Sequence, residues 1–272
     1  MNVPLLAVDG LGLSQGRRRL LDGLDMEVKA GECWALLGRN GAGKTTLLHT
    51  LAGIRSIEAG RIDLLGRSIG DWRARPRAQL LGLLTQDASE GFEETVLEAA
   101  LAGRHPHIGR WSNEGDEDER IARKALHDCG LADFETRAVQ GLSGGERRRL
   151  ALATLLTQDP RLLLLDEPLN HLDLQWQWCI LHQLRQLADS GRGLLMSLHD
   201  PNFALRFCTH ALLMDGEGGW LSGSVAEVIT PSALQRAYGM AMRLIEDPEG
   251  AWVVPDAGAM RAHGMGAEDP VR

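Results

Sequence analysis

The sequence predicts an α/β fold with a mostly parallel sheet, and three observations support this. Short apolar runs alternate with stretches of helical periodicity along the chain, which is the pattern of repeated strand–helix units. The run Leu162–Leu165 is continuously apolar and follows Asp159-Pro160, as expected for a central strand buried on both faces. The run Cys33–Leu37 passes into a glycine-rich loop and then into a helical stretch. No segment repeats, which indicates a single copy of this unit.

The first third of the chain is expected to contain several short strands. Its apolar runs are separated by turns rich in Gly and Asp. The helix after the glycine-rich loop is expected to run from Lys44 to about Ala52, because Gly53 can take the left-handed conformation of a C-cap. The other strand and turn signals here are Leu5–Val8, Met26–Val28, Ala59-Gly60, Gly66 and Leu80–Leu84.

A helical segment and further strands are expected in the rest of the chain. From Thr95 to about Ala138 the pattern is helical, interrupted by a polar and acidic insert at Asn113–Glu119, and we interpret it as a separate helical subdomain. Gly193–Leu198 and Ala211–Met214 have the composition of strands. The residues from about Pro255 are rich in Gly, Ala and Met without periodicity, which predicts a disordered tail over 255–272.

Composition and charge exclude some classes of protein. The 272 residues are 44% apolar and 24% charged, which is ordinary for a globular protein with a buried core. The net charge of −8 and a pI near 5.6 argue against a nucleic-acid partner, which would need a basic face. Two local clusters, Arg17–Arg19 and Arg147–Arg149, are interpreted as solvated faces of a turn or helix.

The cysteine pattern indicates a reducing compartment, and the hydropathy pattern bears on membrane association. Cys33, Cys129, Cys179 and Cys208 are scattered singly, without a CxxC pair or the spacing of metal ligands. The N-terminus lacks the pattern of a secretory signal, and no apolar run is long enough to cross a bilayer. A role at a membrane is therefore expected to depend on a partner.

The glycine-rich loop has the spacing of a phosphate-binding loop. Gly38-Arg39-Asn40-Gly41-Ala42-Gly43-Lys44-Thr45 fits GxxxxGK[ST] directly after a predicted strand and before a predicted helix. The glycines let backbone N–H groups turn toward phosphate oxygens, and the helix N-terminus adds partial positive charge. We expect Lys44 to reach the β- and γ-phosphates, Thr45 to bind Mg²⁺ and Thr46 to donate to the α-phosphate. The loop alone does not separate an ATPase from a kinase or GTPase.

Two carboxylates follow the leucine run. Asp166 and Glu167 stand at the carboxyl end of a predicted parallel strand, where ligands bind in open α/β sheets. Asp166 is expected to hold Mg²⁺ through water, because this ion keeps much of its hydration shell. Glu167 is expected to be the general base that polarises the attacking water.

A third segment, Leu142-Ser143-Gly144-Gly145-Glu146, lies between the loop and the acidic strand end. Ser143 and Glu146 form a capping box, which marks a helix start with exposed N–H donors and thus a second anion site. A plain helix cap would account for the segment in isolation. In this order along the chain, however, the three segments make Leu5 to Met242 closely resemble the ATP-binding cassettes of ABC transporters.

The resemblance implies a fold and a domain organisation. Cassettes of that family are P-loop NTPases with a RecA-like core, a mostly parallel sheet, an antiparallel β region and a helical subdomain. For this chain it implies one nucleotide-binding domain over residues 1–254, with the helical subdomain inserted at approximately 88–158.

The resemblance also implies further site residues. Gln86 matches the glutamine that senses Mg²⁺ and the membrane-domain interface, and His199 matches the histidine that contacts the γ-phosphate. With Lys44 and Glu167 they make up the expected catalytic set, and ATP and Mg²⁺ are the expected cofactors. Leu172-Asp173 matches the segment that links two sites across a dimer. Three residues of the third segment are expected to complete the nucleotide site of the opposite subunit: Ser143, Gly144 and Gly145.

The implied partners are a second ATPase subunit and membrane proteins. One cassette per chain makes a homodimer that buries two ATP molecules the simplest closed arrangement. Polytopic permease subunits, and indirectly a substrate-binding protein, complete such systems. The chain is then expected at the cytoplasmic face of the inner membrane, held peripherally through the permease.

One feature departs from the family pattern. Most members carry an aromatic residue ahead of the first cassette strands that stacks on adenine, and the stretch Leu13–Leu21 has none. An arginine from Arg17–Arg19 can stack its guanidinium plane instead, or another surface can serve.

Within the family the resemblance is greatest to ATPases of metal-chelate importers, which handle iron siderophores, haem and cobalamin. A subunit of an exporter, or a soluble ABC ATPase outside transport, stays an alternative, although soluble members usually carry paired cassettes or long insertions. A GTPase or kinase would not explain Leu142–Glu146. The residues that suggest the metal-chelate group are Ala102-Gly103-Arg104-His105-Pro106, Leu198-His199-Asp200-Pro201-Asn202, and Tyr238-Gly239-Met240 with the extension to Val254.

Overall fold

The computed structural model describes residues 3–86, 94–109, 114–248 and 250–256. Most of the strands predicted from apolar runs gather in one sheet with the order β10-β9-β3-β8-β7-β6. Neighbouring strands are parallel except for β10, which runs antiparallel to β9. The bounds are β3 Cys33–Gly38, β6 Leu81–Leu84, β7 Leu162–Leu165, β8 Gly193–Ser197, β9 His210–Met214 and β10 Trp220–Ser224.

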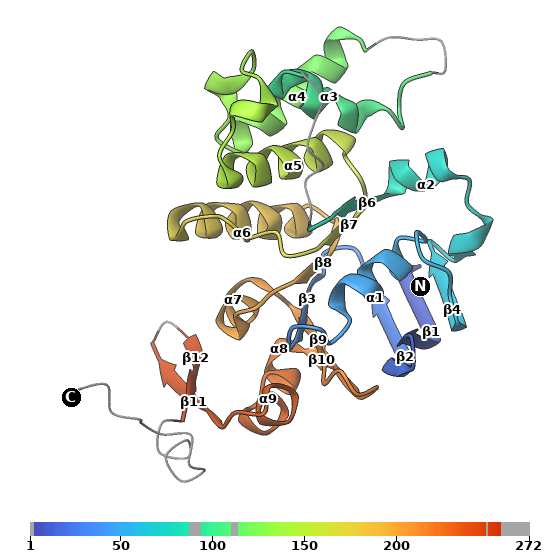
Figure 1. Ribbon diagram of the computed structural model, residues 1–272, viewed down its shortest axis with the longest axis vertical. Helices are drawn as coiled ribbons and strands as arrows, with labels where there is room; N and C mark the ends of the chain where they lie inside the picture. The colour runs from blue at the N-terminus through green and yellow to red at the C-terminus, as the bar shows by residue number, and fades with distance from the viewer. Residues whose placement is uncertain (1–2, 87–93, 110–113, 249, 257–272) are drawn as a thin grey trace.

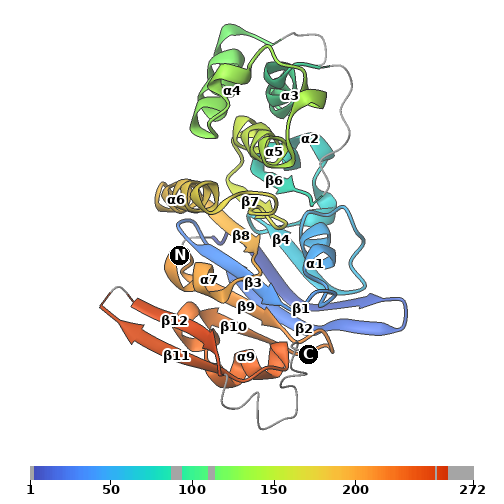
Figure 2. The same ribbon diagram turned by 60° about the vertical axis from the view of Figure 1, so that its left-hand side comes forward.

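A second, antiparallel sheet has the order β2-β1-β4-β5 and lies beside the first (Figure 2). The expected antiparallel region is thus present, but its first strands are longer than the apolar runs at Leu5–Val8 and Met26–Val28. They continue because buried leucines recur as far as the turn at Gly16, at Leu11 and Leu13 in β1 and at Leu20, Leu21 and Leu24 in β2. The bounds are β1 Leu6–Gln15, β2 Arg18–Val28, β4 Ala59–Leu64 and β5 Arg67–Ser68; a separate hairpin pairs β11 Met242–Asp247 with β12 Gly250–Pro255.

Some helices lie against the sheets, and others form a group at one end of the molecule. In Figure 1, α3, α4 and α5 lie together, away from the antiparallel sheet, and α1 lies beside that sheet. The bounds are α1 Lys44–Leu51, α2 Ala74–Leu80, α3 Val96–Leu101, α4 Asp116–Asp128, α5 Gly144–Gln158, α6 Leu174–Asp189, α7 Pro201–Phe207, α8 Val225–Val228 and α9 Pro231–Tyr238.

The acidic stretch expected to interrupt the helical segment is largely part of a helix. Asp116, Glu117, Asp118 and Glu119 form the first turn of α4, where negative side chains are stabilised by the positive end of the helix dipole. Asn113 lies outside the described residues. The expected disordered tail over 255–272 begins too early, because Pro255 ends strand β12 and the Asp256 N–H bonds to the Ala241 carbonyl; residues 257–272 lie outside the described residues.

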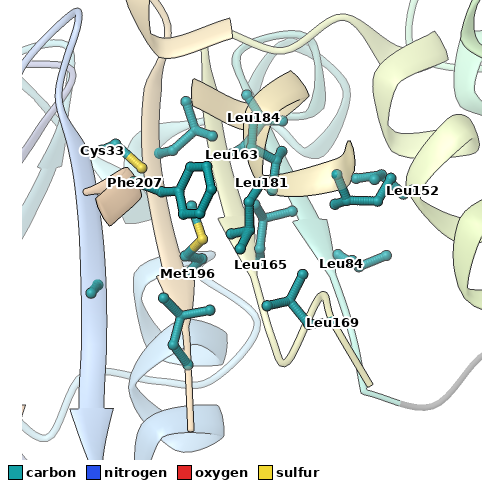
Figure 3. Close-up of a cluster of buried hydrophobic side chains, with 14 of the residues drawn as sticks. Cys33, Leu84, Leu152, Leu163, Leu165, Leu169, Leu181, Leu184, Met196 and Phe207 are labelled. Atoms are coloured by element: carbon teal, nitrogen blue, oxygen red, sulfur yellow. The ribbon is translucent and has the colours of Figure 1, made fainter. Parts of the chain in front are cut away.

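The core has two layers, one on each face of the parallel sheet. Along β7, Leu163 and Leu165 belong to a cluster that includes α5 and α6, while Leu162 and Leu164 belong to a cluster that includes α1 and the antiparallel sheet. Figure 3 shows side chains of the first cluster, contributed by strands and by α5, α6 and α7. The leucine run is therefore buried on both faces of the sheet, as its composition predicts. Packing on both faces holds the carboxyl end of β7, where Asp166 follows, in place.

The C-terminal hairpin is attached to the region just after β8. Asn202, in the first turn of α7, donates from Nδ2 to the carbonyl of Val253 (3.1 Å) and accepts the Val253 N–H on Oδ1 (2.7 Å). The guanidinium of Arg206 lies 4.1 Å from the ring centroid of Trp252. At the end of α9, the Tyr238 hydroxyl accepts the N–H of Gly38, 3.3 Å away. Helix α9 thus contacts the phosphate loop, and the hairpin contacts the helix that follows His199.

All four cysteines are free thiols. Cys33 and Cys208, which lie far apart in sequence, have their sulfurs 3.8 Å apart in the core. Within the described residues, none of the helices is both long and apolar enough to span a membrane.

Candidate active site

The phosphate loop connects β3 to α1 and is shaped by its glycines. At Gly38, φ is 147°, and a Cβ would lie 2.6 Å from the carbonyl oxygen of Met214. At Gly43, the N-cap of α1, φ is 103° and a Cβ would lie 2.9 Å from Leu20. A side chain at either position would collide with a neighbouring strand, so the tight path of the loop requires glycine there.

The remaining predicted loop residues lie around this turn. Arg39, Asn40 and Gly41 are exposed, whereas Ala42 is buried. Thr45 and Thr46 follow Lys44 in the first turn of α1 and are half-buried. The helix N-terminus thus opens onto the surface of the loop, where its free N–H groups can meet an anion.

Lys44 folds back across the loop. Its side chain is buried, and Nζ donates to the carbonyls of Gly38 at 2.7 Å and Arg39 at 3.3 Å. Burial lowers the pKa of this amine, while the negative charges of Glu167 and Asp166 partly oppose the effect. The structure therefore places the ammonium close enough to both carboxylates to feel their charge.

Asp166 is fully buried at the end of β7 and is only half satisfied. Its Oδ1 accepts a hydrogen bond from the Ser197 hydroxyl at 2.7 Å, whereas Oδ2 has no partner within the described residues. A buried carboxylate oxygen without a partner is costly. The unpaired oxygen fits a carboxylate that awaits a cation or a water held by one.

Glu167 is held in a constrained turn directly after Asp166. Its φ of 48° is uncommon for a residue other than glycine. Its N–H donates to the Ser197 hydroxyl at 2.7 Å, and its carboxylate contacts Asn170 Nδ2 and, at 2.9 Å, His199 Nε2. The two side chains expected to act on the γ-phosphate and the attacking water are thus in direct contact.

Gln86 lies at the same edge of the sheet. β6 pairs with β7 in parallel register, Leu84 beside Leu165, and Gln86 is exposed just beyond the end of β6. Residues 87–93, which follow it, lie outside the described residues. The phosphate loop, Gln86, Asp166, Glu167 and His199 therefore all follow the carboxyl ends of parallel strands.

The Ser143 segment, Leu142–Glu146, does not share its neighbours with the residues at the carboxyl ends of the strands. Ser143 Oγ accepts the Glu146 N–H (3.3 Å), and Glu146 Oε2 accepts the Ser143 N–H (2.6 Å), so the predicted capping box is formed. Ser143 and Gly144 are exposed, and a Cβ at Gly145 would lie 2.9 Å from the His171 carbonyl. Among the described residues, no hydrogen bond or ion pair joins this segment to the phosphate loop.

Leu172-Asp173 leads from the acidic strand end into α6. Asp173 is the N-cap of that helix and accepts the Trp176 N–H at 2.9 Å. His171, Leu172 and the Ser143 segment lie side by side. The segment expected to link two sites therefore adjoins the segment expected to complete a neighbour's site.

The arginine clusters differ from each other. Arg17–Arg19 is exposed as expected, and Arg18 donates from Nε and Nη2 to the Gly216 carbonyl at 3.0 and 2.8 Å. The interpretation of Arg147–Arg149 as a solvated face is wrong for two of its members. Arg148 and Arg149 are buried, because their guanidinium groups reach backbone carbonyls in neighbouring elements, and only Arg147 is exposed.

Sequence reasoning missed Ser197, Asn170 and Arg148. Ser197 is two residues before His199, and Asn170 is three residues after Glu167. A single buried hydroxyl at a strand end carries no pattern of its own. Its role is visible only once β8 is known to pair with β7, which brings Ser197 to Asp166.

Comparison with known proteins gives a consistent result. The family model described as ABC transporter matches residues 21–170. The hemin import ATP-binding protein of Myxococcus xanthus is 37% identical over 93% of this chain and 98% of its own. The iron(3+)-hydroxamate import ATP-binding protein of Bacillus subtilis is 34% identical over 89% and 91%. Among solved structures, a metal-chelate type ABC transporter in an inward-facing conformation matches with a TM-score of 0.81 and 26% identity, over 94% of this chain and 99% of that one.

Proposed function

The chain belongs to the ABC transporter family, and from this premise we propose that it hydrolyses ATP to power an importer of a metal chelate. The observation that carries the proposal is the arrangement at the end of β7. There a buried Asp166 with one unpaired oxygen precedes Glu167, whose carboxylate contacts His199. The names of the relatives support the substrate class, since one is a hemin importer and another an iron-hydroxamate importer.

The loop geometry suits the phosphates of ATP, the nucleotide that the family indicates. Backbone N–H groups of residues 39–43 and the first turn of α1 would surround the phosphates, with Thr46 donating to the α-phosphate. Lys44 can exchange its bonds to the Gly38 and Arg39 carbonyls for phosphate oxygens. Its ammonium would then neutralise charge on the β- and γ-phosphates.

The residues present also fit Mg²⁺. Oxygen ligands suit this ion, and the unpaired Oδ2 of Asp166 together with the Thr45 hydroxyl and the Gln86 amide oxygen provides them. The ion would supply charge neutralisation between the phosphates. Ser197, by donating to Oδ1, keeps the Asp166 carboxylate turned so that Oδ2 stays available.

Glu167 is proposed to polarise the attacking water. Its left-handed backbone and the hydrogen bond that its N–H donates to the Ser197 hydroxyl direct the carboxylate toward the strand ends, where it contacts His199. His199 would contact both the γ-phosphate and Glu167 and so fix their relative positions. Water loses a proton to Glu167 as it attacks phosphorus, and ADP leaves as the bond to its terminal oxygen breaks.

The exposed Ser143 segment is proposed to complete the site of a second copy. Ser143, Gly144 and Gly145 present N–H donors at the start of α5, and their chain neighbours do not include the phosphate loop. A homodimer would bury two ATP molecules between two such faces. Permease subunits, with a substrate-binding protein behind them, would hold this dimer at the cytoplasmic face of the inner membrane.

The decisive experiment is co-purification. Tagged Glu167→Gln protein is isolated from its native membranes in mild detergent with ATP, and Glu117→Gln, an exposed carboxylate on α4, is the matched control. We expect a polytopic membrane protein to accompany the Glu167 variant, with a metal chelate in the preparation. A soluble partner alone would refute transport, and a membrane partner whose reconstituted vesicles extrude the chelate would indicate export.

A further inference from the structure

Arg148 is a buried charged group that the proposed chemistry does not use. It is the fifth residue of α5, the helix that begins beside Ser143. Its Nη1 donates to the carbonyl of Thr85 at 2.6 Å, and its Nη2 donates to the carbonyls of Glu167, at 2.7 Å, and of Asp166. One side chain of α5 therefore holds three carbonyls at the ends of β6 and β7.

These carbonyls belong to the segments that carry the chemistry. Thr85 precedes Gln86, while Asp166 and Glu167 are the carboxylate pair. A strained residue such as Glu167 keeps its left-handed backbone only where its surroundings hold it. The Ser197 hydroxyl accepts its N–H and Arg148 donates to its carbonyl, so both of its peptide groups are fixed.

Stability gives a poor reason for this arrangement. Burial lowers the pKa of Arg148, although the nearby negative charges of Asp166 and Glu167 oppose it, and Nε has no partner within the described residues. A buried guanidinium bonded to carbonyls is a costly way to join two elements. The neighbouring Arg149 already ties α5 to the end of α4, through the carbonyls of Cys129 and Gly130.

We propose that Arg148 is a positioning residue that links helix α5 to the turn at Asp166–Glu167, so that the orientation of Glu167 depends on where α5 lies. The proposal rests on the proposed function, which makes Glu167 the base. Ser143 and Arg148 are separated by about 7 to 8 Å along one helix axis. A helix that engages a second subunit through Ser143 therefore cannot shift without moving the guanidinium that holds Glu167.

The first test compares Arg148→Met with a control. Methionine keeps the apolar stem and removes the donors. We expect kcat for ATP to fall roughly ten- to hundredfold, since a small misplacement of a reacting group has this cost, while KM and the Kd for ATP stay unchanged. Arg120→Met, at an exposed arginine of α4, should keep the kcat of the wild-type chain. A parallel loss of ATP affinity and melting temperature in Arg148→Met would show a merely structural role and overturn the proposal.

The second test is a double variant. If Arg148 acts through Glu167, the pair Glu167→Gln/Arg148→Met should turn over ATP at the rate of Glu167→Gln alone. Two effects that multiply would overturn the proposal. Wild-type protein that binds no ATP or fails to hydrolyse it would instead refute the proposed function, so the two failures are distinguishable.

The third test uses Arg148→Lys, which keeps the charge but cannot hold three carbonyls at once. We expect it to recover only part of the lost kcat. Complete recovery would show that charge alone suffices and would overturn the positioning role. If Arg148→Met fails to fold, the lysine variant and its double with Glu167→Gln carry the same decision.

Discussion

The end of β7 and the start of α5 are both expected to contact ATP, yet they are built in opposite ways. Asp166 and Lys44 are buried, and their partners come from the phosphate loop and a neighbouring strand. Ser143 and Gly144 are exposed, and the side-chain bonds of Ser143 stay within its own helix. The first region is assembled within one chain, whereas among the described residues the second has no hydrogen bond or ion pair to the phosphate loop. Under the proposed function, one half of the nucleotide site is therefore fixed by folding, and the other half forms only when a second copy binds.

The largest expected effect is at the assembled region. Glu167→Gln removes the general base, so ATP turnover should fall roughly 10²- to 10⁴-fold, while equilibrium binding of ATP persists. Phosphate release measured alongside binding of a fluorescent ATP analogue checks this. Normal turnover in the variant would end the assignment of Glu167 as base.

Lys44→Ala removes the buried ammonium from the same region. Turnover should fall on the order of 10²-fold or more, by analogy with the loss of one donor to a developing negative charge. ATP binding should weaken as well, which separates this variant from Glu167→Gln. The measurements are kcat for ATP hydrolysis and the Kd for ATP. The control is Lys124→Ala, at an exposed lysine on α4. Near-normal activity would contradict the mechanism.

A substitution at the start of α5 should affect turnover and dimerisation, not ATP binding by the monomer. Ser143→Ala should leave ATP binding by the monomer intact, but reduce turnover about tenfold or more, because a hydrogen bond to a charged group contributes about 1.5–3 kcal/mol. Sizing in the Glu167→Gln background with ATP should show fewer dimers. Ser224→Ala removes a similar capping box from α8 and should not change dimerisation. Equal dimer fractions in the two variants would show that Ser143 does not contribute to dimerisation.

The smallest effect is expected on recognition of the adenine ring of ATP. Arg18 lies beside the loop, bound to the Gly216 carbonyl, and a guanidinium stacked on an exposed ring is worth about 0.5–1 kcal/mol. Arg18→Ala should therefore weaken ATP binding roughly two- to fivefold and reduce the preference over GTP. Arg19→Ala, at a neighbour paired with Asp22, is the control. Identical ATP/GTP competition in both variants would place the base elsewhere.

Much of this architecture was predictable, for physical reasons. A central parallel strand needs apolar residues on both faces, so Leu162–Leu165 indicates β7 directly, and the glycine spacing indicates the loop. Helix α2 was missed because it contains Pro76 and shows no apolar face. Arg148 and Arg149 were misread because a run of arginines looks the same whether its side chains meet water or distant carbonyls. Ser197 could not be found before the strand order was known.

The attachment of the C-terminal hairpin has a consequence for how the protein can be altered. Asn202 bonds to Val253 and Tyr238 bonds to Gly38, so β12 and α9 contact α7 and the first residue of the phosphate loop. An insertion or deletion within the hairpin would remove the bonds to Asn202, which lies three residues after His199. Truncations that remove β11 and β12 should therefore be treated as changes to the surroundings of the active site.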